Sequence, residues 1–364
     1  MSAAQHTAVQ EVLASGWLSM GPRVATFEEA FAADAKVPHA VAVSNGTAAL
    51  ILALQAVGVG PGDEVVMPSF TFVACASAVT VLGATPVFAD ICAPERPLVD
   101  PHDVLDAVTE RTRAVLVVHY GGALVDMDAL VPLRERGIAL VEDAAHAAGP
   151  LSDDGSWMPL RGDAAAYSFF ANKNLALGEG GMVSCGEATV AERVRLLRAH
   201  GMTAGTWDRH SGRATDYDVT TIGWNFRLTE MQAAMGTSAL VDLPSGNAAR
   251  RRLLACYADE LTGSPIHLAF ERQMRTAGHL AVAALPKPGM RSAVRDALAS
   301  RGIQSSFHYP PIHRFKAYAD RPSRPLPRTD DAAGRLVTVP LHPYLTVEEV
   351  QEICSTVRTV VGSV

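Results

Sequence analysis

Between about residues 40 and 185, short runs of β-branched and apolar residues alternate with stretches that carry apolar residues at helical spacing. The runs predict strands at 40–44, 64–68, 85–90, 114–120, 138–143, 164–170 and 181–185. The stretches between them predict helices at 47–58, 72–83, 102–112 and 127–137, most of which end at glycine. A repeated strand–helix unit of this kind indicates an α/β protein with a mostly parallel sheet flanked by helices.

Helical spacing continues after the last of these strands, and a second unit follows. Helices are predicted at 188–199 and 227–241, and Pro244 and Gly246 in the segment LPSGN then favour a domain boundary. We therefore expect a large domain over residues 1–243 and a smaller C-terminal α+β domain over 244–364. The smaller domain should hold a long helix, a strand at 279–286, and helices at 292–302 and 346–361.

The segment SNGTAALILAL places a small polar turn between a strand and an apolar helix. Free backbone N–H groups and the helix dipole make such a helix start a phosphate site, here around Thr47. Taken alone, the motif has a simpler interpretation in which Ser44 or Thr47 only caps the helix.

The segment VEDAAHAAG ends an apolar strand with Glu142 and Asp143, and His146 follows three residues later. A carboxylate at the carboxyl end of a parallel strand lies at the mouth of the sheet, where it can hold a positively charged ring nitrogen. The alternative is that Asp143 caps a turn and that His146 is a hydrogen-bonded core histidine.

Composition narrows the class of function. With 48% hydrophobic and 19% charged residues the chain should fold throughout, and a net charge of −7 disfavours nucleic acid or an anionic membrane as a partner. No secretory signal or 18-residue apolar run is present, so the sequence predicts a soluble cytoplasmic protein. The five widely spaced cysteines indicate neither disulfides nor a metal site, and we expect them to be small buried apolar residues.

Lysine is scarce, and this makes one lysine conspicuous. Of 31 basic residues only Lys36, Lys173, Lys287 and Lys316 are lysines. Lys173, in SFFANKNLALGEGG, alone follows a buried-looking strand and precedes a glycine cluster. A lysine amine can form a Schiff base when its pKa is lowered, which an arginine at neutral pH cannot do.

A phosphate cradle, a strand-end aspartate and a lysine about thirty residues later are the three parts that a pyridoxal phosphate enzyme needs. Each part is weak evidence by itself. In this order on an α/β sheet they favour a cofactor with its aldehyde on Lys173, its ring nitrogen at Asp143 and its phosphate at Thr47.

With these residues in view, the sequence resembles the DegT/DnrJ/EryC1/StrS family of pyridoxal phosphate-dependent sugar aminotransferases, which have fold type I. The resemblance covers nearly the whole chain. It rests on SGWLSMGPRVATFEEAFA, AVSNGTAALILAL, GDEVVMPSFTFVA, GATPVFAD, VVHYGG, VEDAAHAAG, YSFFANKNLALGEGGM, GWNFRLTEMQAA, HYPPIH and VPLHPYLTVEEV.

The resemblance implies roles for individual residues. Lys173 would form the Schiff base, Asp143 would pair with the ring nitrogen, Phe72 would stack on the ring, and His146 would hydrogen-bond the cofactor's polar edge. Phosphate would be held by Gly46, Thr47, Ala48 and Ser168. Asn225 would reach the phosphate of a neighbouring subunit, which implies a homodimer with shared sites. Phe170 and Gly122 depart mildly from the family pattern, in ways that bear on substrate shape.

The implied reaction moves an amino group from L-glutamate or L-glutamine to a keto-sugar or keto-cyclitol, with pyridoxamine phosphate as the intermediate form of the cofactor. The candidate substrate residues are Arg209, His210, Arg213, Arg227, His308, Tyr309 and His313. The arginines of the 200–218 loop could hold a nucleotide diphosphate, or could belong to a solvated surface loop, and Arg227 could equally form an ion pair. High arginine and low lysine are compatible with antibiotic biosynthesis.

Two competing interpretations stay open. One is a pyridoxal phosphate sugar dehydratase, epimerase or oxidase on the same scaffold, although family members that dehydrate carry histidine in place of Lys173. The other is a sensor that binds cofactor or sugar without turnover. A dinucleotide oxidoreductase is disfavoured, because GVGPGD follows a helix instead of opening one.

Overall fold

A seven-stranded sheet forms the centre of the computed structural model, which describes residues 2–149, 151, 157, 161–270, 275–319 and 324–363. The strand order is β1-β9-β8-β7-β6-β2-β3, and all strands except β9 run in one direction. The strands are β1 (His39–Val43), β2 (Glu64–Pro68), β3 (Thr85–Ala89), β6 (Thr112–Val118), β7 (Ala139–Asp143), β8 (Ala164–Ser168) and β9 (Gly181–Cys185). The predicted mostly parallel sheet is confirmed.

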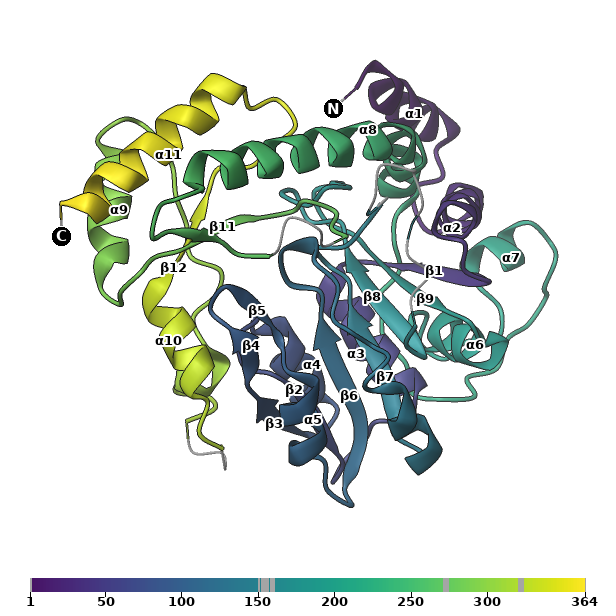
Figure 1. Cartoon of the computed structure of the whole chain (residues 1–364). Coiled ribbons are helices and arrows are strands. Elements are labelled where there is room, and N and C mark those ends of the chain that lie inside the picture. Colours follow the sequence, from purple (N-terminus) through teal and green to yellow (C-terminus); the bar gives the residue numbers. More distant parts are fainter. Residues whose placement is uncertain are drawn as a thin grey trace.

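Helices cover both faces of this sheet (Figure 1). Helices α3 (Gly46–Ala56), α4 (Ala74–Val81) and α6 (Ala188–Leu197) pack on one face, and α2 (Pro22–Ala35) packs against β1 on the other. Strand residues alternate between two apolar clusters: Val41 and Val43 join α3 and α4, whereas Ala40 and Ala42 join Phe27 of α2. Burial on both faces explains why the strands read as continuous apolar runs.

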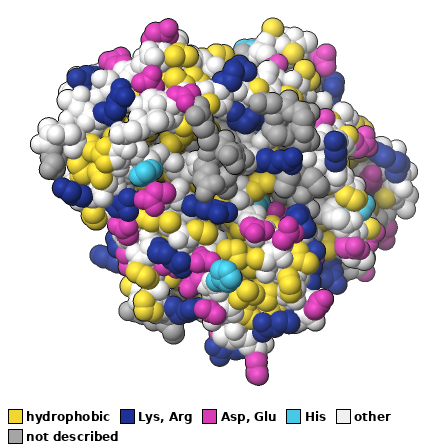
Figure 2. Space-filling view, in the orientation of Figure 1, with side chains coloured by type: hydrophobic (Ala, Val, Ile, Leu, Met, Phe, Trp, Pro, Cys, Tyr) yellow, Lys and Arg dark blue, Asp and Glu magenta, His cyan; other side chains and the backbone are white. Residues whose placement is uncertain are grey.

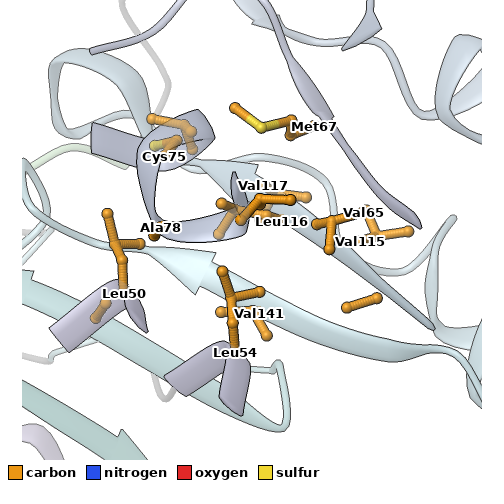
Figure 3. Close-up of a cluster of buried hydrophobic side chains, with 14 of the residues drawn as sticks. Leu50, Leu54, Val65, Met67, Cys75, Ala78, Val115, Leu116, Val117 and Val141 are labelled. Atoms are coloured by element: carbon orange, nitrogen blue, oxygen red, sulfur yellow. The ribbon is translucent and has the colours of Figure 1, made fainter. Parts of the chain in front are cut away.

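Figure 3 shows part of the first cluster, in which Leu50 and Leu54 of α3 lie near Val141 of β7. Cys75 and Ala78 of α4 lie in the same cluster, beside apolar side chains of β2 and β6. The apolar packing fixes where α3 and α4 begin relative to the ends of the strands.

The long helix α8 (Glu230–Leu261) corrects the expected pair of helices. It is continuous through Pro244 and Gly246, so the predicted boundary between residues 243 and 244 falls inside a helix. Along the top of Figure 1 it runs from α1 (Ala3–Ser15) and α2 toward the C-terminal part. Packing on α1, α2 and the C-terminal elements outweighs the loss of one helical hydrogen bond at proline.

The C-terminal part contains a three-stranded antiparallel sheet, β10 (His267–Leu268), β11 (Ala281–Ala284) and β12 (Leu336–Val339). Helices α9 (Met290–Ala299) and α11 (Val347–Gly362) pack with the second half of α8 around their own apolar cluster. Helix α10 (Pro327–Arg335) contacts β4 (Ile91–Ala93), which forms a hairpin with β5 (Arg96–Val99).

Two predicted helices are shorter than expected. The 127–137 segment forms only a 3-10 helix at Val131–Arg136, since Pro132 stands in its first turn and Gly137 ends it. Helix α5 (Pro101–Ala107) stops before residue 112 because Val108 is extended. The remaining short helices are α7 (Thr206–His210), Tyr120–Gly122 and Ile312–Arg314.

On the face drawn in Figure 2, basic side chains (dark blue) and acidic side chains (magenta) are interspersed, and neither kind forms a large continuous patch. Over the described parts of the chain, no helix is both long and apolar enough to cross a membrane. The same residues include no group of three His, Cys, Asp or Glu side chains placed to hold a metal.

Candidate active site

A cavity of about 580 Å³ opens where β6, β7 and β8 end and α3 begins. The segment 71–74, which leads into α4, the loop after β8 and the 308–309 segment form its other walls. The residues that line it are Asn45, Gly46, Thr47, Ala48, Leu50, Ile51, Thr71, Phe72, Ala74, Val118, Asp143, Ala145, His146, Ala166, Ser168, Phe170, Asn172, Lys173, Glu179, Phe226, His308 and Tyr309. The carboxyl ends of parallel strands are where α/β sheets place ligands.

The start of α3 presents a polar end to the cavity. Asn45 caps the helix by accepting from the Ala48 amide at 2.8 Å, so neither Ser44 nor Thr47 is the cap. The amides of Gly46 and Thr47 donate to none of the described residues. A Cβ at residue 46 would lie 2.7 Å from Cβ of Ser168, so glycine lets that serine approach the helix end. Two amides, a hydroxyl and a helix dipole converge there.

Asp143 lies at the end of β7 and is buried. Its Oδ1 accepts from the Ala145 amide at 2.9 Å, and its Oδ2 accepts from the Cys75 thiol at 3.0 Å. The expectation that all five cysteines are apolar filling is therefore wrong for Cys75, and Cys92 and Cys256 are only half-buried. The carboxylate is held by two donors and still lines the cavity.

Lys173 lies on the loop that joins β8 to β9. Backbone bonds from Phe169 to Gly180 and from Lys173 to Phe170 hold this loop closed. The Lys173 ammonium makes no hydrogen bond or ion pair with any residue that the structure describes. Burial lowers the pKa of Lys173 to about 8, although nearby Asp143 and Cys75 oppose the shift. The amine is available for chemistry in the cavity.

His146 is a buried residue of the cavity wall, and both its ring nitrogens have partners. The Gly121 amide donates to Nδ1 at 3.1 Å, so Nε2 carries the proton of the neutral ring and donates to the Tyr309 hydroxyl at 3.1 Å. Burial, with Lys173, His279 and His308 nearby, holds the pKa of His146 well below its usual range. Tyr309 can therefore direct its own proton into the cavity.

Aromatic side chains form much of the mouth. Phe72 is 53% exposed and Phe170 is 44% exposed, although both are large and apolar. The ring of Phe72 lies 5.6 Å from that of Tyr309. Exposed aromatic rings at a cavity are suited to covering a flat or apolar ligand.

The structure brings together ten of the sixteen predicted site residues in one cavity, and the lining includes Gly46, Thr47, Ala48, Phe72, Asp143, His146, Ser168, Lys173, His308 and Tyr309. Phe170, which had been singled out only as a departure from the family pattern, also lines it. His308 bonds Thr338 through Nδ1 at 2.9 Å, and burial together with Lys173 lowers its pKa to about 4.

Six predicted residues lie away from the cavity of this chain. Arg209 covers the ring of Tyr217, Arg213 lies 3.8 Å from Asp208, and His210 stacks on Trp17. The expected loop is thus packed through Trp207 and His210 against Trp17, which follows α1. The others are Asn225, which is exposed, Arg227, and His313, which bonds Ser69 and Asp330 instead of facing the cavity.

Sequence reasoning missed Asn172, Glu179, Thr71 and Cys75, which also line or adjoin the cavity. Asn172 and Glu179 flank Lys173 in a segment already singled out, so their proximity was a usable signal. Cys75 carried no such signal, because cysteine in an apolar helix reads as core.

A second set of polar side chains anchors the Lys173 loop from behind. Asn174 donates through Nδ2 to Oδ1 of Asn247 at 2.8 Å, and His279 contacts Oδ1 of Asn174 at 3.0 Å. Asn247 is a fully buried residue of α8 and also donates to the Ala148 carbonyl. The residue after Lys173 is thereby tied to the long helix.

The residues present fit the cofactor that the sequence implies. Unpaired amides at a helix start suit a phosphate, the held carboxylate suits a protonated ring nitrogen, and an unpaired amine of lowered pKa suits an aldehyde. The exposed face of Phe72 lies on the same cavity.

Comparison with known proteins agrees with the cofactor that the site residues fit. Residues 1–358 match the profile of the DegT/DnrJ/EryC1/StrS aminotransferase family. The solved structure of S. venezuelae DesV in complex with a ketimine intermediate is 38% identical, with a TM-score of 0.89, and the match covers 100% of this chain and 95% of that one. DesI, solved in the presence of its TDP-sugar product, is 33% identical with a TM-score of 0.87 over 99% and 90%.

A third similar structure bears on the cofactor. Spr1654 of Streptococcus pneumoniae, solved in a PMP form, is 28% identical with a TM-score of 0.91 over 100% of this chain and 98% of that one. It has also been solved in a PLP form. Both forms of the cofactor are thus known in this one similar protein.

Proposed function

This chain belongs to the DegT/DnrJ/EryC1/StrS family of pyridoxal phosphate-dependent sugar aminotransferases, and on that premise we propose that it moves an amino group from L-glutamate or L-glutamine to a nucleotide-linked keto-sugar. The single observation that carries the proposal is Lys173, a lysine of lowered pKa with no partner among the described residues, in one cavity with Asp143 and the start of α3.

Each cavity residue then has a proposed role. The amides of Gly46 and Thr47, with the Ser168 hydroxyl, hold the phosphate, and Ala48 lies in the same first turn. Asp143 holds the ring nitrogen, and Phe72 covers one face of the ring. When bound, pyridoxal phosphate supplies an aldehyde that condenses with an amine and a protonated ring that withdraws electrons from the reacting carbon.

Lys173 carries the proton in this proposal. With the cofactor bound, its Nζ would be the group that bonds the aldehyde and, once free as a neutral amine, the group that takes up and returns the proton moved during amino transfer. Because burial lowers the pKa of Lys173 to about 8, about a tenth of the amine is neutral at pH 7, against about one part in three thousand for an ordinary lysine.

The second half of the reaction needs a site for the acceptor. Tyr309, whose hydroxyl accepts from His146, is placed to donate a hydrogen bond into the cavity, and Phe170 offers an apolar wall. DesI, which is similar to this chain, was solved with a TDP-sugar product, and this supports a nucleotide-linked acceptor over a free cyclitol.

A homodimer with shared sites is part of the same proposal. Among the described lining residues Lys173 is the one side chain that carries positive charge, since burial favours neutral His146 and His308. A cofactor phosphate, a nucleotide diphosphate and the carboxylates of the donor need more positive charge than one lysine supplies. Next to Asn225, Val219 is 54% and Ile222 is 90% exposed, which is typical of a surface that a second copy covers. Arg209 and Arg213 would then act in the partner's site.

Amino transfer is tested by the fate of the donor. We expect the purified enzyme, loaded with pyridoxal phosphate and given L-glutamate or L-glutamine without acceptor, to form one equivalent of the keto acid per active site. A catalytic excess of keto acid appears only after a keto-sugar is added. A dehydratase, epimerase or oxidase would instead consume sugar with no keto acid, and a sensor would form neither product.

Shared sites are tested by mixing two crippled chains, Lys173→Ala and the double variant Arg209→Ala, Arg213→Ala. Each alone should be nearly inactive with a nucleotide sugar. Random re-association should restore about a quarter of wild-type activity, because half the dimers regain one intact site of two. A mixture that stays inactive although the chains exchange would contradict the sharing, and full activity of the arginine variant would favour a cyclitol acceptor.

We also propose a cytoplasmic location and a place in antibiotic biosynthesis, both of which rest on the family resemblance and on composition. Loss of an amino sugar from the products of a strain that lacks this gene would support the second point, and unchanged products would contradict it.

A further inference from the structure

We propose that Cys75 is a positioning residue, whose thiol orients the Asp143 carboxylate toward the ring nitrogen of the cofactor. This inference rests on the role proposed for Asp143 above. It gives a functional role to a side chain that the sequence alone predicts to be a buried apolar core residue.

The two hydrogen bonds to Asp143 leave its carboxylate one orientation. Oδ1 accepts from the Ala145 amide at 2.9 Å and Oδ2 from the Cys75 thiol at 3.0 Å. With a donor on each oxygen, rotation about the bond to the carboxylate would break at least one hydrogen bond. A carboxylate has about four lone-pair directions, so acceptor capacity remains for a group in the cavity that Asp143 lines.

Cys75 can only be the donor in this contact. Burial, and next the charge of Asp143, raise the pKa of the Cys75 thiol well above its ordinary value, so the sulfur keeps its proton. The proton is committed to Asp143, so the hydroxyl of Thr71, 3.7 Å from Sγ, donates to the sulfur. Thr71, Cys75 and Asp143 are exposed by only 1%, 0% and 6%, so water does not compete for these bonds.

The place of Cys75 in the fold adds a second consequence. It stands in the first turn of α4, and its amide donates to the Phe72 carbonyl at 3.3 Å. Figure 3 shows Cys75 on this helix among apolar side chains of the large cluster. The turn that presents the ring of Phe72 to the cavity is therefore bonded to the carboxylate at the end of β7. One residue couples the group proposed for the ring face to the group proposed for the ring nitrogen.

Infrared spectroscopy of the full chain tests the bond directly and needs no cofactor. The difference spectrum of wild type minus Cys75→Ser isolates the S–H stretch of Cys75 from those of the other four thiols. We expect it below the frequency of a free thiol, and we expect it to rise in Asp143→Ala. A wild-type band at the free-thiol frequency, or one unmoved in Asp143→Ala, overturns the inference.

Cofactor binding tests the positioning. Cys75→Ala should weaken the affinity for pyridoxal phosphate about five- to tenfold, the value of one modest hydrogen bond. Cys75→Ser, which supplies a hydroxyl donor, should recover most of the loss. Cys354→Ala, which removes an equally buried cysteine from α11, should change nothing. Wild-type affinity and an unchanged visible spectrum in Cys75→Ala would overturn the positioning role even with the infrared band shifted.

Two other causes of a weak affinity for pyridoxal phosphate, a misfolded variant and a wrong proposed function, can be told apart from loss of the Cys75 hydrogen bond. Circular dichroism melting identifies a Cys75→Ala variant that has lost its fold, and the Cys75→Ser comparison and the infrared band then decide the matter. If the wild-type chain binds no pyridoxal phosphate at all, the proposed function fails, while the thiol–carboxylate bond is still read from the infrared spectrum.

Discussion

Replacing Lys173 with alanine should lower kcat at least about a thousandfold, because the variant loses both the amine that bonds the cofactor and the group that moves the proton. The fold should survive. The Lys173 ammonium makes no hydrogen bond or ion pair with the described residues, so its removal leaves no buried partner unpaired. Sodium borohydride followed by peptide mass spectrometry should find reduced cofactor on the Lys173 peptide of the wild type and none in the variant.

Lys287→Ala is a matched control for this experiment, since Lys287 is exposed and lies outside the cavity. It should keep full activity and the covalent cofactor. Cofactor attached to another lysine in the wild type, or more than a few per cent of wild-type turnover in Lys173→Ala, would contradict the role proposed for Lys173.

The pH dependence of cofactor capture follows from the same amine. Burial lowers the pKa of Lys173 to about 8, and the neutral form, present above that pH, is the nucleophile. The rate at which the cofactor-free protein forms the reducible adduct should therefore rise up to about pH 8 and then level off. A rate that still climbs toward pH 10 would mean that the amine is solvated like that of an ordinary lysine.

The second large effect is expected from Asp143→Asn, which should lower kcat by roughly two orders of magnitude or more. The amide carries no charge to keep a ring nitrogen protonated. It also turns an NH₂ group toward one of the two donors, the Ala145 amide and the Cys75 thiol, that the carboxylate accepts from. Cofactor affinity should fall as well, though far less than kcat.

Stopped-flow absorbance of the donor half-reaction measures this effect separately from binding. Asp143→Asn should still form the reducible adduct with Lys173 and then react slowly with L-glutamate or L-glutamine. Asp143→Glu, which keeps the charge but displaces it, should recover part of the rate. Equal rates in wild type and Asp143→Asn would show that the charge does not act on the ring.

The sheet was predictable because its strands are buried on both faces and therefore read as apolar runs of the right length. The elements that sequence reasoning missed depend on packing between distant parts. Pro244 is a local helix breaker, yet α8 continues through it because its two halves are held on α1 and α2 at one end and on α11 at the other. The two-residue strand β10 exists only because β11 pairs with it.

For the candidate site, too, some features could be predicted from the sequence and others could not. Asp143, Ser168 and Lys173 stand at or just beyond the ends of strands, so the predicted topology alone brings them to one edge. Hydrogen-bond partners in the site could not be predicted from the sequence where they come from residues that are far away along the chain. His146 was expected to hydrogen-bond the cofactor's polar edge. It lines the cavity, and sequence reasoning could not foresee that the Gly121 amide and the Tyr309 hydroxyl are partners of its two nitrogens. The thiol on Asp143 comes from 68 residues upstream.

The continuous helix α8 also limits how this enzyme can be recombined with its relatives. A chimera that exchanges residues 244–364 must join two half-helices, and a one-residue error there would rotate everything downstream by about 100° and shift it about 1.5 Å along the axis. Asn247 would then turn away from Asn174, the neighbour of Lys173. A crossover that keeps the whole of α8 with the large sheet, and changes parent only after Leu261, preserves that contact.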